Sequence, residues 1–232
     1  MEIVLVIVLI AIFAAVIKFG SKNDDRLHLA TLQVLEHIRY TQHLAMNDDK
    51  FDPRDNRYKD TPHNAKTAGD GRYFRGWWQI RFQVVAATNA DNGFVGYSVY
   101  SDFDREGNID KKDTLNSAIN PADGKWMILY DDCDSCSSDV FLDKKYDIKE
   151  IAFSSNCQKV GFHKISSRNI GAIIFDEKGR PYYGISNEAN KNPFKYRLTA
   201  DCDITLTADT GKTSTIRVYP ESGYTEILNI EQ

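Results

Sequence analysis

Residues 3–17, IVLVIVLIAIFAAVI, form an unbroken apolar run that decides the fold predicted from the sequence. A helix of this length measures roughly 22 Å at about 1.5 Å per residue, short of the ~30 Å hydrocarbon core of a bilayer. The run has no polar face, which disfavours a soluble core helix. A signal peptide usually carries a basic flank and a small-x-small cleavage site, and neither is clear here. A membrane anchor whose extreme N-terminus is missing fits best.

The charges around the run conflict with a head outside the cytoplasm. Glu2 precedes the run, and positive charges follow it at Lys18, Lys22 and Arg26. Taken literally, the positive-inside rule would place the following domain in the cytoplasm. A basic leader missing from this chain would remove the conflict.

A second helical pattern follows the apolar run. Its apolar residues recur at helical spacing through about residue 46, at Leu27, Ala30, Val34, Leu35, Ile38, Ala45 and Met46. Gly20-Ser21 can bend the helix without ending it. We therefore expect one long helix whose first half lies in lipid and whose amphipathic second half packs on the rest of the chain.

The rest of the chain is typical of β structure. Residues 47–75 are polar and broken by prolines and glycines, which predicts a long loop. Runs of β-forming residues, separated by turn signals, predict strands at 77–86, 93–100, 125–130, 147–154, 170–175, 196–207, 213–219 and 224–228. No convincing helix follows residue 75. The predicted fold is α+β: a long N-terminal helix, with a membrane half and an amphipathic half, packed on an antiparallel β-sheet head.

Four segments carry a resemblance to a known family. They are residues 1–12 (MEIVLVIVLIAI), 37–45 (HIRYTQHLA), 173–181 (IIFDEKGRP) and 220–224 (PESGY). In this order they resemble the start of the apolar helix, the end of the long helix, the Gly-Arg-Pro turn and the closing hairpin of type IV pilin-like proteins. More narrowly, they resemble minor, H-type pseudopilins of the type II secretion system. The leader processing site of that family is not present, so cleavage and N-methylation cannot be read from this chain.

The resemblance implies a structural subunit and no active site. Residues 1–20 would form a transmembrane and filament-core segment, and residues 21–232 a periplasmic head containing a helix of about 24–46. The chain would be a single-pass protein of the bacterial inner membrane, acting in protein secretion or in a pilus-like filament. Its partners would be other pilin-like subunits, contacted through the N-terminal helix, and a prepilin peptidase.

Glu2 would be the family glutamate that pairs with a neighbour's N-terminal amine and sets the subunit register. A glutamate buried in a filament core costs several kcal/mol unless it is paired. The alternative is that Glu2 is simply a polar residue at a membrane interface.

Two other functions compete with this one. The first is a DNA-binding minor pilin of a competence system, in which the aromatic and basic residues at 72–81 could grip a single strand. The net charge of −4 disfavours it, and the same residues could simply fill a core. The second is a signal-anchored periplasmic enzyme, for which no catalytic grouping stands out.

Residues 102–113, DFDREGNIDKKD, nearly fit a twelve-residue calcium loop. The candidate ligands are Asp102, Asp104, Glu106, Asn108 and Asp113. Glu106 is long for the fifth position, and Asp113 replaces the usual bidentate glutamate. The alternative is a solvated acidic turn between strands. No other cofactor is indicated.

All four cysteines fall late in the chain, at Cys133, Cys136, Cys157 and Cys202. An even count in a tethered domain suits an oxidising compartment. A zinc site and a redox Cys-x-x-Cys are the alternatives, and the surrounding aspartates would raise the thiol pKa that redox chemistry needs low. Sequence cannot choose among the three pairings; we favour structural disulfides, as Cys133–Cys136 and Cys157–Cys202.

Overall fold

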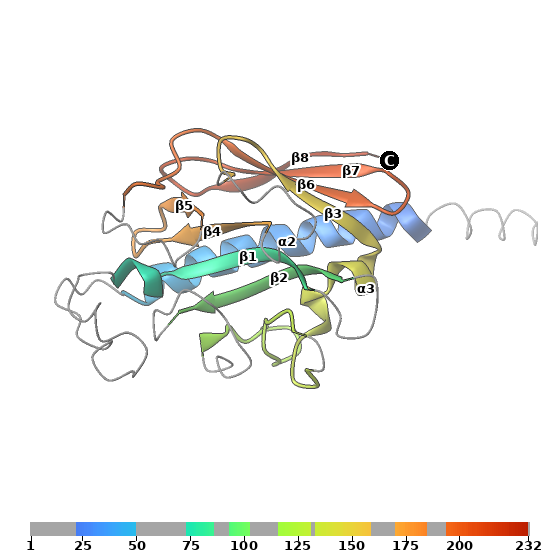
Figure 1. Cartoon of the computed structure of the whole chain (residues 1–232), viewed down its shortest axis with the longest axis horizontal. Helices are drawn as coiled ribbons and strands as arrows, with labels where there is room; N and C mark the ends of the chain where they lie inside the picture. The colour runs from blue at the N-terminus through green and yellow to red at the C-terminus, as the bar shows by residue number, and fades with distance from the viewer. Residues whose placement is uncertain are drawn as a thin grey trace, which may run out of the picture.

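The computed structural model describes residues 22–49, 73–85, 93–102, 116–130, 133–158, 170–184 and 194–231. Helix α2 (Lys22–Asn47) runs lengthwise through the molecule and packs against two four-stranded antiparallel sheets (Figure 1). Its buried residues include Leu27, Ala30, Val34 and Ile38, which share one face at the helical period.

The first sheet has the strand order β2-β1-β4-β5. Its strands are β1 (Trp78–Val85), β2 (Phe94–Ser101), β4 (Gly171–Phe175) and β5 (Pro181–Tyr183). Ile80 of β1 lies opposite Val99 on one side and Ile173 on the other. All three side chains are buried in the core beneath α2.

The second sheet has the strand order β3-β6-β7-β8. Its strands are β3 (Ile148–Phe153), β6 (Cys202–Ala208), β7 (Thr213–Val218) and β8 (Thr225–Ile230). Alternate residues of β6 are buried, as expected for a strand with one face toward the core. Three short helical segments lie outside the sheets: Tyr73–Gly76, Ser138–Val140 and α3 (Leu142–Tyr146).

One hydrophobic core joins α2 and both sheets. The ring of Phe82, in the first sheet, lies 5.5 Å from the ring of Phe153 in the second and 5.6 Å from Tyr97 beside it. Edge-on and tilted aromatic contacts of this kind add to the gain from burying the rings.

The predicted fold class is wrong. It placed one antiparallel sheet on a long helix with a membrane half, whereas the structure is mostly β, in two four-stranded sheets around a helix of 26 residues. The expected membrane half, residues 1–20, lies outside the described residues. Within the described part, neither helix combines the length and the apolar character that crossing a bilayer requires.

The elements predicted after residue 75 differ from the structure in four places. Residues 125–130 form no strand; they lie beside β2, where Val99 N donates to Met127 O at 2.8 Å. Helix α3 and strand β5 were not predicted, because each is too short for a periodic signal. Strand β6 begins at Cys202, six residues later than expected.

Candidate functional site

Five of the ten predicted functional side chains lie outside the described residues: Glu2, Asp104, Glu106, Asn108 and Asp113. Asp102 is described, directly after β2, and is 1% exposed. The residues that the structure describes contain no cluster of three or more His, Cys, Asp or Glu suited to a metal ion. Calcium binding by residues 102–113 stays a prediction, which a thermal melt with and without a chelator would decide.

The four cysteines form two disulfides, Cys133–Cys136 and Cys157–Cys202. The second joins the turn after β3 to the first residue of β6. Beside it, Asp203 N donates to Ser154 Oγ at 3.0 Å. This disulfide therefore fastens an edge strand of the second sheet to its neighbour.

Three of the four segments that carry the family resemblance meet near the C-terminal end of α2. The side chain of Gln42 donates from Nε2 to Gly179 O at 2.8 Å and to Ser222 O at 2.7 Å. One amide thus ties the helix to the Gly-Arg-Pro turn and to the closing hairpin. Gly223 makes this close approach feasible: its φ is +65°, and a Cβ there would lie 2.6 Å from Gly179 O.

Asp176, which is fully buried, shapes the Gly-Arg-Pro turn. Its carboxylate accepts from Arg180 Nε at 2.6 Å, from Arg180 N at 2.9 Å and from Tyr182 OH at 3.1 Å. Burial, and then the nearby Asp176 carboxylate, raise the pKa of Tyr182. The hydroxyl therefore stays protonated and donates to Asp176, so the polar groups of the turn are paired with one another.

A second polar cluster joins α2 to β2 and was not expected from the sequence. His37 is buried, and its Nδ1 lies 2.7 Å from Tyr97 OH. Gln33 Nε2 donates to the same hydroxyl at 2.9 Å, and Tyr146 OH donates to Gln33 Oε1. Burial lowers the pKa of His37 to about 4. The ring is therefore neutral at physiological pH.

Two of the aromatic and basic residues near the start of β1 are buried. Trp77 is buried, with its ring 4.9 Å from that of Tyr182. Arg81 is buried too, and its guanidinium lies 5.4 Å from the centre of the Tyr100 ring. These side chains are therefore not displayed for stacking on a nucleic-acid strand.

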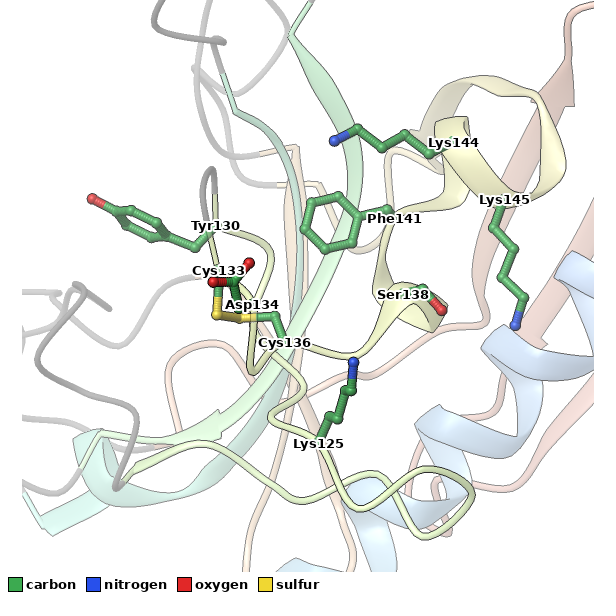
Figure 2. Close-up of a pocket in the computed structure, with 9 residues that line it drawn as sticks. All are labelled: Lys125, Tyr130, Cys133, Asp134, Cys136, Ser138, Phe141, Lys144 and Lys145. Atoms are coloured by element: carbon green, nitrogen blue, oxygen red, sulfur yellow. A yellow bond between two sulfur atoms is a disulfide. The ribbon is translucent and has the colours of Figure 1, made fainter.

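A hollow with a volume of about 590 Å³ lies beside the Cys133–Cys136 disulfide (Figure 2). It is lined by Lys125, Tyr130, Cys133, Asp134, Cys136, Ser138, Phe141, Lys144 and Lys145. Figure 2 shows Lys144 and Lys125 reaching toward Phe141 from opposite sides, while Lys145 points away from the ring. We call this hollow the lysine pocket.

The described lining of the lysine pocket holds three lysines and one acid, Asp134, in a protein whose net charge is −4. Lys145 forms an ion pair with Asp139. Lys144 Nζ lies 3.7 Å from the centre of the Phe94 ring, a cation–π contact. Sequence reasoning missed the pocket because its lysines lie on separate segments, and only the adjacent pair at 144–145 hinted at it.

A scan against protein-family models, a search of curated proteins and a search of solved structures each find no match to the chain.

Proposed function

We propose that the chain is a membrane-tethered structural subunit, acting as a minor pseudopilin-like component of a type II secretion or type IV pilus-like apparatus. The observation that carries the proposal is the position of α2. The apolar run 3–17 precedes this helix closely in sequence, and α2 is the element on which both sheets pack.

Several contacts fasten α2 into the head along its length. Arg26 forms an ion pair with Asp147, and Thr31 Oγ1 donates to Ser214 Oγ at 2.8 Å. Further along, Arg39 Nη2 donates to Thr225 O at 2.8 Å. A tether attached to the start of α2 would therefore act on the whole head, as an assembly subunit requires.

The cysteines favour a head outside the cytoplasm. All four are oxidised in the structure, and such disulfides persist in the periplasm and on cell surfaces but rarely in the cytosol. Gln42 contacts both the Gly-Arg-Pro turn and the closing hairpin. This contact also supports the proposal, because it brings together three segments that carry the family resemblance.

The test is Glu2→Ala in the full chain, produced in a bacterium that carries such an apparatus. We expect wild-type protein in the membrane fraction, with subunit–subunit cross-links. The variant should lose cross-links by more than about tenfold. Without Glu2, the N-terminal amine of the neighbouring subunit is left unpaired, and an unpaired charge in a packed core costs several kcal/mol. Glu150→Ala, at an exposed site on β3, is the matched control. Normal cross-linking of the Glu2 variant, or wild-type protein free of the membrane, would contradict the proposal.

A further inference from the structure

We propose that the lysine pocket binds an acidic peptide segment of a partner protein, one carboxylate side chain lying between Lys125 and Lys144 and an adjacent apolar side chain against Phe141. This site is independent of the proposed assembly role. Its test is direct binding, so a failed Glu2 experiment would leave it standing.

The charges of the pocket favour an anion. Among the described residues, no acid forms an ion pair with Lys125 or with Lys144. Lys145 is already neutralised by Asp139, whose second oxygen accepts from Asn120 Nδ2 at 2.8 Å. Two lysines against Asp134 leave a net charge of +1 among the described lining residues. Asp131 and Asp132, next in sequence, lie outside them.

The lining favours a singly charged group on an apolar body over phosphate. Lys144 and Lys125 enter the pocket from opposite sides and do not converge on one point (Figure 2); Lys144 Nζ lies 5.0 Å from the centre of the Phe141 ring. None of the described lining residues is an arginine, whose fork is the usual partner of a phosphate bound by two hydrogen bonds. Asp134 in the wall would repel a dianion about twice as strongly as a carboxylate. The ring of Phe141 and the disulfide supply apolar surface for a neighbouring side chain.

The walls are held in place before any ligand arrives. The disulfide closes the turn at 133–136, and this turn is bonded to the segment carrying Lys125: Trp126 N donates to Ser135 O at 3.0 Å, and Ser137 N to Trp126 O at 2.8 Å. A preformed pocket loses less conformational entropy on binding than a flexible loop. Only the lysine side chains would lose conformational freedom when the peptide binds.

The experiment uses the full chain in detergent micelles and a fluorescein-labelled, amidated peptide of alternating Glu and Leu. Fluorescence anisotropy measures the dissociation constant, and a Gln-Leu peptide tests the need for charge. K125Q/K144Q should weaken binding about tenfold, the effect of losing two exposed ion pairs. K149Q/K178Q is the matched control, because it removes two exposed lysines outside the pocket. K125Q alone changes one exposed side chain, so it should weaken binding without affecting the fold. Circular dichroism of each variant checks that it is folded.

The results that overturn the proposal are specific. Equal binding of the Glu-Leu and Gln-Leu peptides would remove the charge recognition. An equal loss in K149Q/K178Q would show a general charge effect and no pocket. Displacement of the peptide by inorganic phosphate or by glutarate at the same concentration as unlabelled peptide would show that a free anion, and not a peptide, is the ligand. The expected result is displacement by unlabelled Glu-Leu peptide and weaker binding as salt rises.

Discussion

Replacing Gln42 with Ala tests the joint at the end of α2. The substitution removes the donor to Gly179 O and to Ser222 O, the two contacts that tie the Gly-Arg-Pro turn and the closing hairpin to the helix. Alanine is a better helix former than glutamine by only a few tenths of a kcal/mol, so the change in helix propensity offsets little of the loss.

The size of the effect follows from the two hydrogen bonds. A typical intramolecular hydrogen bond contributes about 0.5–1.5 kcal/mol net. Water can replace the partner at the exposed Ser222 contact, so the lower half of the sum, about 1–2 kcal/mol, is expected. For a chain of this size that loss lowers the melting temperature by about 2–8 °C. Circular dichroism of the purified full chain in detergent measures it, with His43→Ala, at an exposed site on the same turn, as the control.

A second variant, Gln42→Glu, sharpens the test. At neutral pH the carboxylate has no donor and faces two carbonyl oxygens, so this variant should melt below Gln42→Ala. Those oxygens raise the folded-state pKa of the new carboxyl, and protonation restores one donor. The loss should therefore shrink, relative to wild type, as pH falls below about 5. Wild-type stability of Gln42→Glu at pH 7 would refute the reasoning, whatever Gln42→Ala does.

Two further predictions concern stability. The pKa of His37 is about 4 in the folded protein and about 6.5 when unfolded. Between these pH values the unfolded state therefore binds more protons than the folded state. Protonation of His37 should lower the free energy of unfolding by about 2 kcal/mol from pH 7 to pH 4.5. Urea unfolding at both pH values should show this difference between wild type and His37→Gln, and parallel pH dependence would exclude it. From loop-closure entropy, replacing Cys157 and Cys202 by serine should cost about 4 kcal/mol, and replacing Cys133 and Cys136 about 1.6 kcal/mol. Denaturant unfolding gives both values, and the reverse order would show that the loop lengths do not set them.

Periodicity predicted the helix well but not the sheets. Six of the seven apolar positions of the helical pattern are buried, and the seventh, Met46, is 50% exposed because it lies in the last turn, at the edge of the core. A period-2 pattern reports that one face of a strand is buried, and it says nothing about which strand lies beside it. The pairings of β1 with β4 and of β3 with β6, between strands far apart in the chain, therefore could not be read from the residues.

The polar contacts were harder to predict than the core. Gln42 and Gly179 are 137 positions apart, and Gln33 and Tyr146 are 113 apart. Nothing in the sequence near either glutamine predicts these hydrogen bonds, because their partners come close only in the folded protein. The Gly-Arg-Pro turn could be found because Asp176, Lys178, Gly179 and Arg180 bond within a few residues.

The order in which the chain is made has a consequence for how the head folds. Helix α2 is near the start of the sequence, whereas β8, whose Thr225 carbonyl receives Arg39, is the last strand. During synthesis the part of the helix that packs on β6, β7 and β8 therefore stays uncovered until about the final thirty residues are made, since elements cannot pair before they exist. Chains cut short before β6 would leave the ribosome with that part of the helix exposed, and would be natural clients for chaperones and proteases.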